Sequence, residues 1–228
     1  MEFPDRAGVM ILSGACLFPQ ALLPLFIFEP RYRRMLAASL DGPRMFVVAM
    51  ARPDVARESP LPVAGLGLVR ASVQNDDGTS NLVLQGLTRV RLGKVIRYKP
   101  YREMQLEPLP DSSPSSLLVD ALQSRMMDLV ETRLRQGATM SLALLAQVAG
   151  GVTGPLTGAD VSVEDCLATL RRVDDPGFLA DLVALMLLPN PLARQVILQT
   201  VDVAERLKNL IRFLLAEVAR KRQEEAEQ

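Results

Sequence analysis

The sequence predicts an α+β chain, with a small antiparallel, partly closed β-barrel in residues 1–112 and an α-helical bundle in residues 113–228. Apolar residues recur with a period of two up to about Leu106 and with a period of 3.6 after Ser115. Three closely spaced prolines lie between these two parts. With 228 residues, 49% of them apolar, the chain can form one large or two small domains, and we expect a soluble globular protein.

The stretch Leu17–Leu36 reads LFPQALLPLFIFEPRYRRML and organises the predicted barrel. Its first half is apolar and contains Pro19 and Pro24, which lack the N–H group that the interior of a helix needs. We therefore expect this half to be extended and buried, as a strand or a strand-like arm.

The second half of this stretch predicts a helix that begins at Glu29-Pro30. Proline at the first helical position gives up an N–H group that would have no partner there, and an acidic residue suits the positive helix end. The helix should end near Asp41-Gly42-Pro43. Three residues at helical spacing should face the sheet: Tyr32, Met35 and Leu36.

The other strands are predicted from short apolar or alternating runs bounded by turn residues. They are Gly8–Leu12, Met45–Met50, Val63–Gln74, Asn81–Val95 and Tyr101–Leu106. Arg52–Pro62 contains three prolines and mixed charges, which predicts a surface loop. Asn75-Asp76-Asp77-Gly78 predicts a tight hairpin turn, because Asp and Gly tolerate positive φ angles. Glycines within the strands, at 65, 67 and 86, predict bends or bulges.

Helices are predicted from the apolar period and from their cap residues. The first has one apolar face, formed by Leu118, Leu122, Met126, Leu129, Val130 and Leu134, and should end at Gly137. Cap residues are expected at Ser162, Asp175, Asn190 and Asp202. The last helix carries a continuous stripe of Val203, Leu207, Leu210, Ile211, Leu214 and Val218, and residues 220–228 should fray. Short connections of this kind favour antiparallel packing in a bundle.

The segment Gln136–Ala159 has no charged residue, but its five glycines and Pro155 disfavour a membrane span. One interpretation is a short helix over Ser141–Ala149 followed by a glycine-rich loop. The alternative is an exposed apolar patch or loop that contacts a polypeptide client.

The motifs resemble those of a known family. The run PLFIFEPRYRRML, followed by a buried strand, is similar to the start of the N-terminal, substrate-binding domain of Lon proteases, the LON domain. The resemblance continues through Gly65-Leu66-Gly67, Leu84–Arg91 and Asp174–Leu182. It implies that the barrel is a PUA-like pseudobarrel and that the chain binds unfolded or damaged polypeptides. A complete Lon protease also has ATPase and protease modules, which this sequence lacks, so a separate ATP-dependent protease is an implied partner.

The residue inventory disfavours an enzyme. The chain has no histidine, so a Ser-His or Cys-His nucleophile is excluded, and a zinc site is unexpected with only Cys16 and Cys166. No phosphate-binding loop of the GxxxxGK[ST] type is present. A hydrolase that uses carboxylates alone remains a weak alternative. We therefore expect no catalytic residue, no metal, no cofactor and a non-enzymatic binding module.

Candidate binding residues are the aromatic side chains that could contact an apolar client. They are Phe26, Phe28, Tyr32, Tyr98 and Tyr101. A second set matches the signature of the LON domain and is expected to be structural. It consists of Pro24, Glu29, Pro30, Arg31, Tyr32, Gly86 and Arg89.

The alternative function is RNA binding, because PUA-like barrels elsewhere bind RNA. A set of basic and aromatic residues near one another along two strands would carry it: Arg89, Arg91, Lys94, Arg97, Tyr98, Lys99, Tyr101 and Arg102. The net charge of zero disfavours a nucleic-acid or membrane partner. The start of the chain faintly imitates a lipoprotein signal before Cys16, but its acidic residues outnumber its one arginine, so we expect a cytoplasmic protein.

Overall fold

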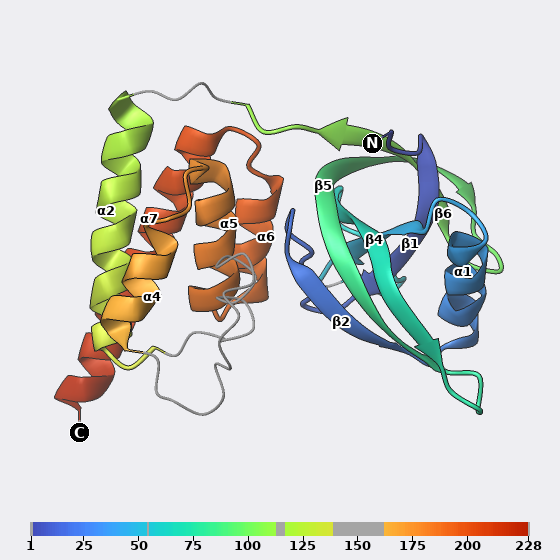
Figure 1. Cartoon of the computed structure of the whole chain (residues 1–228), viewed down its shortest axis with the longest axis horizontal. Helices are drawn as coiled ribbons and strands as arrows, with labels where there is room; N and C mark the ends of the chain where they lie inside the picture. The colour runs from blue at the N-terminus through green and yellow to red at the C-terminus, as the bar shows by residue number, and fades with distance from the viewer. Residues whose placement is uncertain (1, 54, 113–116, 139–161, 228) are drawn as a thin grey trace. The chain divides into compact units, whose positions relative to one another are not determined.

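The computed structural model describes residues 2–53, 55–112, 117–138 and 162–227, and the chain divides into two compact units. The units are Met1–Pro110, which holds the sheet, and Asp111–Gln228, which is helical (Figure 1). The α+β class is thus confirmed, with a β unit followed by an α unit.

The β unit contains six strands and one helix. They are β1 (Arg6–Leu12), β2 (Leu22–Ile27), α1 (Pro30–Leu40), β3 (Met45–Met50), β4 (Val63–Gln74), β5 (Ser80–Arg97) and β6 (Glu103–Leu109). The strand order is β2-β5-β4-β3-β1-β6, and β5 also pairs with β6. Five strands therefore form a closed ring, and β2 extends the sheet from one side of β5.

The sheet is mixed, and the expectation of purely antiparallel pairing was wrong for one pair. β1 and β3 are parallel, with Val9 opposite Val47 and Leu12 opposite Met50. A parallel pair needs a long crossover between its strands. Here β2 and α1 supply that crossover.

The arm of residues 17–28 is only partly buried, which corrects the expectation of a buried strand. Leu17 and Phe18 are each 1% exposed, but β2 pairs only with β5 and alternates between inward and outward residues. The N–H of Gly86 on β5 donates a hydrogen bond to the carbonyl of Ala21. Because successive residues of an antiparallel strand point their backbone groups alternately toward and away from the partner strand, the backbone nitrogen of Pro24 faces away from β5. An edge strand tolerates proline at such a position.

Glycines on β4 and β5 let the backbone of Leu17-Phe18 approach the sheet. A Cβ atom at Gly65 would lie 2.0 Å from the carbonyl oxygen of Leu17, and one at Gly86 would lie 1.9 Å from that of Phe18. The β4–β5 register also shifts between Leu66 and Gly67, so the expected bulge is present. The close approach of the Leu17-Phe18 backbone is therefore a second reason for glycine at these two positions, and it could not be predicted from the sequence.

Both faces of β3 are buried, as its continuous apolar sequence predicts. Phe46 and Val48 belong to the core that α1 covers, together with the predicted helix face of Tyr32, Met35 and Leu36. Val47 and Ala49 belong to a second core, which β6 and β1 complete.

The hairpin at residues 75–78 is confirmed, with Gly78 at a φ of +76°. Asp77 Oδ1 accepts hydrogen bonds from the hydroxyl of Thr79 at 2.6 Å and from the Thr79 N–H group at 2.9 Å. These bonds favour the charged carboxylate and lower the pKa of Asp77.

We expect the Thr79→Val substitution to raise the pKa of Asp77, because it removes the hydroxyl donor and keeps the N–H donor. Titration of the Asp77 carboxyl carbon by NMR measures this shift, and Thr79→Ser, which keeps the hydroxyl, is the control. Because the folded pKa is the lower one, this contribution to stability is present above the unfolded pKa of about 3.9. It is lost as the pH falls through the folded pKa. An unchanged titration in the valine variant would contradict the assignment.

The described helices of the second unit are α2 (Leu117–Arg135), α4 (Val163–Leu170), α5 (Pro176–Leu187), α6 (Pro191–Gln199) and α7 (Val203–Ala226). All four predicted caps are confirmed, because each cap side chain accepts an N–H bond from the first turn of its helix. Gly137 follows the end of α2 with a φ of +82°.

Two details of the helical prediction were wrong. Leu118 is 52% exposed, and Val119 is buried instead. The end of α7 is helical to Ala226, where Arg220 pairs with Glu217 and Glu224. The first pair is spaced i,i+3 and the second i,i+4, and ion pairs at these spacings stabilise a helix. Most of the uncharged segment, residues 139–159, lies outside the described residues.

Candidate functional site

The outer face of β2 continues across β5 and β4 as one apolar surface. Directly opposite residues of an antiparallel pair share a face, and the register aligns Phe26 with Asn81 and Val73 in one row. The next row aligns Pro24 with Val83 and Ala71. We call the apolar members of this face, with Phe28, the β2 surface: Pro24, Phe26, Phe28, Ala71, Val73 and Val83.

Two aromatic side chains dominate the β2 surface. Phe26 is 55% and Phe28 59% exposed, and their rings are stacked with centroids 6.0 Å apart. Val73 on the neighbouring β4 is 65% exposed. Beside Phe26 lies a shallow hollow of about 490 Å³, lined by residues of β2, β4 and β5. Stacked aromatic side chains in this exposed position are available to a ligand.

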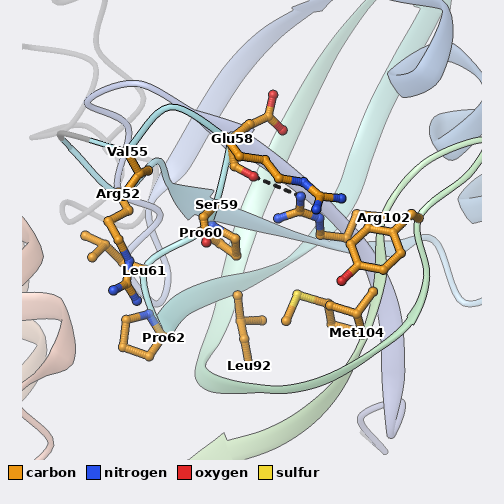
Figure 2. Close-up of a pocket in the computed structure, with 13 residues that line it drawn as sticks. Arg52, Val55, Glu58, Ser59, Pro60, Leu61, Pro62, Leu92, Arg102 and Met104 are labelled. Atoms are coloured by element: carbon orange, nitrogen blue, oxygen red, sulfur yellow. Dashed lines mark hydrogen bonds between the residues drawn. The ribbon is translucent and has the colours of Figure 1, made fainter.

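Tyr98 lies at a second hollow of about 610 Å³, which we call the Tyr98 pocket. The loop between β3 and β4 forms one wall, and residues of β5 and β6 form the floor (Figure 2). Tyr98 is 57% exposed, and the guanidinium carbons of Arg57 and Arg102 lie 5.4 and 5.6 Å from its ring centroid. The pocket thus combines cations, an aromatic ring and an apolar floor.

The other two candidate aromatic residues lie in the core. Tyr32 is 4% exposed, and its hydroxyl accepts from the N–H of Ile11 at 3.0 Å and donates to the Ile11 carbonyl at 3.1 Å. Burial raises the pKa of Tyr32. Tyr101 is 8% exposed, and its ring lies 4.5 Å from the guanidinium of Arg97. The structure therefore brings Phe26 and Phe28 together, places Tyr98 at a separate pocket and turns Tyr32 and Tyr101 inward.

The signature residues at the start of α1 form an ionic network. Arg31 pairs with Glu29 at 2.8 Å and with Glu58 of the β3–β4 loop at 2.8 Å. Its guanidinium also lies 4.4 Å from the ring centroid of Tyr32. Burial opposes the charge of Arg31, but the bonds to the two carboxylates outweigh burial and raise its pKa. The network ties the helix start to the loop that forms one wall of the Tyr98 pocket.

The basic residues of the RNA-binding alternative do not form a continuous set of free cations. Arg89 is 2% exposed. Arg91 pairs with Glu107 at 3.5 Å, and Arg97 pairs with Glu103 at 2.7 Å. Single-stranded RNA needs a positively charged groove with stacking platforms, so this arrangement does not favour RNA.

Sequence reasoning missed a buried charge cluster in the helical unit. Arg206 is fully buried on α7 and contacts both carboxylate oxygens of Asp111, at 2.8 and 2.5 Å. Asp181 of α5, itself 2% exposed, lies 3.4 Å from the same guanidinium. One signal was available, because Arg206 falls three residues after Val203 and four before Leu210, on the apolar stripe.

Among the described residues, no group of three or more His, Cys, Asp and Glu side chains is arranged to hold a metal ion. Within the same residues, no helix combines the length and the apolar character needed to span a bilayer.

Comparison with known proteins identifies relatives over most of the chain. The family model of the ATP-dependent protease La (LON) substrate-binding domain matches residues 7–216. The Lon protease of Desulfovibrio desulfuricans is 30% identical over 211 residues, which are 90% of this chain and 22% of that protein. The Lon protease of Dictyoglomus thermophilum is 23% identical over 222 residues, which are 95% of this chain and 25% of that protein. The chain spans about a quarter of the length of these relatives.

Two solved structures share the fold. The N-terminal domain of the Mycobacterium avium complex Lon protease has a TM-score of 0.65 at 17% identity, covering 92% of this chain and 97% of that one. The Lon N-terminal domain protein from Xanthomonas campestris has a TM-score of 0.58 at 18% identity, covering 91% and 98%. With the family match over residues 7–216, these likenesses show that the chain belongs to the family of ATP-dependent protease La (LON) substrate-binding domains.

Proposed function

We propose that the chain binds unfolded or damaged polypeptides without altering them, and that it presents them to an ATP-dependent protease. The exposed, stacked pair Phe26 and Phe28 on the β2 surface carries this proposal. Aromatic side chains, Phe included, supply large apolar contact area and are enriched in the cores of protein interfaces. Membership of the LON substrate-binding family supports the same role.

Within this proposal the signature residues act structurally. Tyr32 joins α1 to β1, and Arg31 joins α1 to the β3–β4 loop. Gly86 gives the backbone of Phe18 room to approach the sheet. Pro24 occupies an edge strand, where its missing N–H group has no partner to lose. We place the protein in the cytoplasm, where a client-delivering domain would meet unfolded chains.

We expect Phe26→Ser/Phe28→Ser to weaken client binding by about tenfold or more, because it removes both exposed rings. The client is fluorescein-labelled α-lactalbumin, reduced and blocked with iodoacetamide so that it stays unfolded, and binding is read by fluorescence anisotropy. Leu192→Ser/Leu215→Ser is the matched control, because these leucines of the helical unit are 48% and 42% exposed.

Three results would contradict the proposal. The first is that the unfolded client does not bind to the unaltered protein, and the second is that the two double variants bind it equally well. The third is a change in the client's mass after incubation with the protein alone, which would contradict the non-enzymatic role.

A further inference from the structure

Backbone hydrogen bonds hold both ends of the β3–β4 loop, which forms one wall of the Tyr98 pocket. Ala51 pairs with Pro60 in an isolated β-bridge, and the N–H of Arg52 bonds the carbonyl of Ser59 at 2.7 Å. The N–H of Leu61 bonds the carbonyl of Met50 at 2.8 Å. These bonds close the β3–β4 loop at its base, so its ends are fixed by the sheet.

The floor of the pocket is aliphatic and continuous with the second core of the β unit. Leu92 and Val95 of β5 pack against that core, which includes Met104 of β6. Together with Leu61 and Pro62 they line the pocket (Figure 2). A volume of about 610 Å³ lies within the range of ligand pockets, and it is sufficient for an apolar side chain with its neighbouring backbone.

The charges around this floor are unbalanced. Among the described residues that line the pocket, three are arginines, Arg52, Arg57 and Arg102, and one carries a carboxylate, Glu58. Glu58 lies 2.8 Å from Arg31 of α1, which it shares with Glu29, so its charge is already partly compensated. Arg102 donates one hydrogen bond to the backbone carbonyl of Glu58, at 2.9 Å, and its remaining donors can bind an anion (Figure 2).

The cations are also held in position. The guanidinium groups of Arg57 and Arg102 both lie over the ring of Tyr98, which restricts their movement. Arg52 and Arg102 lie on opposite sides of the pocket in Figure 2. A guanidinium binds a carboxylate with two parallel hydrogen bonds and is more weakly hydrated than an ammonium group. The pocket is therefore complementary to a ligand with an apolar centre and carboxylates on its flanks.

We propose that the Tyr98 pocket binds segments of an unfolded polypeptide in which an aliphatic residue is flanked by Asp or Glu. The aliphatic side chain lies on the floor formed by Leu92, Val95 and Met104. One flanking carboxylate binds at Arg57 and Arg102 beside Tyr98, and the other binds Arg52 on the opposite side of the pocket. This inference rests on the proposed function, because it names a class of segment that the domain selects in its clients. It adds charge selectivity to the apolar contacts proposed for Phe26 and Phe28.

A polypeptide fits this pocket better than a single-stranded nucleic acid does. Nucleic-acid grooves present aromatic faces on which successive bases stack. Here the floor is aliphatic, and the ring of Tyr98 already has two guanidinium groups over it.

The test uses three labelled peptides that share a Gly-Ser framework and differ at the centre: Glu-Leu-Asp, Gln-Leu-Asn and Glu-Ser-Asp. We expect the first to bind the full chain about tenfold or more tightly than either of the others, because only it fills both the cationic rim and the floor. Arg57→Gln/Arg102→Gln should remove most of this preference, because Arg52 alone remains, whereas Arg212→Gln/Arg222→Gln, which changes two exposed arginines of α7, should keep it. Arg57→Gln alone should reduce the preference without disturbing the loop, since Arg57 contacts only the exposed ring of Tyr98 among the contacts shown.

Three results would overturn the assignment of this ligand to the Tyr98 pocket. They are equal binding of the three peptides, an unchanged preference for the Glu-Leu-Asp peptide in both Arg57 variants, and displacement of that peptide by an oligouridylate. The unfolded α-lactalbumin assay separates this failure from that of the proposed function. If the client binds through Phe26 and Phe28 but the peptides are not distinguished, only the pocket assignment fails. If the unaltered protein binds neither client nor peptide, the proposed function fails as well.

Discussion

Arg206→Met is expected to destabilise the helical unit by about 3–5 kcal/mol, because it removes the cation beside the buried carboxylate of Asp181 and the partly exposed carboxylate of Asp111. The guanidinium of Arg206 donates to the carbonyls of Thr200, Val201 and Gly177 as well as to Asp111. Burial by itself would lower the pKa of Arg206, but the bonds to Asp111 and the charge of Asp181 outweigh it and raise the pKa. Methionine replaces the volume of the side chain but none of these bonds.

The burial of Asp181 explains why the expected loss of stability is large. Its side chain is 2% exposed, so it cannot recover its hydration when Arg206 is removed. Asp111 is 33% exposed and regains part of its contact with water. Arg206→Lys should cost less than Arg206→Met, because an ammonium group restores the charge but offers three donors in place of five.

Urea denaturation followed by far-ultraviolet circular dichroism measures this prediction, because five of the six described helices are in the helical unit. All three tyrosines of the sequence are in the β unit, so tyrosine fluorescence follows that unit separately. Arg212→Met, an exposed position on the same helix, is the control and should stay within about 0.5 kcal/mol of the unaltered protein. A loss below about 1 kcal/mol for Arg206→Met would show that the cluster does not stabilise the bundle.

Gly86→Ala is expected to destabilise the β unit by about 3 kcal/mol, at the upper end of the cost of overpacking a core. The added methyl group would lie 1.9 Å from the carbonyl oxygen of Phe18 and 3.3 Å from the side chain of Leu17. The first contact is with backbone, which cannot rotate away as a flexible side chain can. Phe18 is 1% exposed, so the arm can retreat only by giving up its own burial.

Tyrosine fluorescence during urea denaturation measures this loss in the unit that contains Gly86. Gly42→Ala is the matched control, because its methyl group would lie 3.5 Å from the nearest atom, which is ordinary contact. We expect the control to stay within about 0.5 kcal/mol. If the two variants have the same stability, then the close approach of Phe18 to Gly86 does not determine the packing of the arm.

The sequence by itself determined the elements whose causes lie within a few residues. Asp175, Asn190 and Asp202 each cap a helix through N–H groups two or three residues away, so the residue types alone predict the helix starts. The hairpin at Gly78 likewise depends on four neighbouring residues. The residues at the start of α1 that match the LON signature indicate the family by their types and order alone.

Only the tertiary structure decided which distant residues meet. The parallel pairing of β1 with β3, the position of β2 at an edge and the exposure of Phe26 depend on sheet order, which local propensity does not encode. Arg206 finds Asp111 across 95 positions of sequence, and the Tyr98 pocket joins the loop after β3 to residues of β5 and β6. Such contacts form when separate elements bury their apolar faces together, so their partners are selected by packing of the whole unit and not by the spacing of residues along the chain.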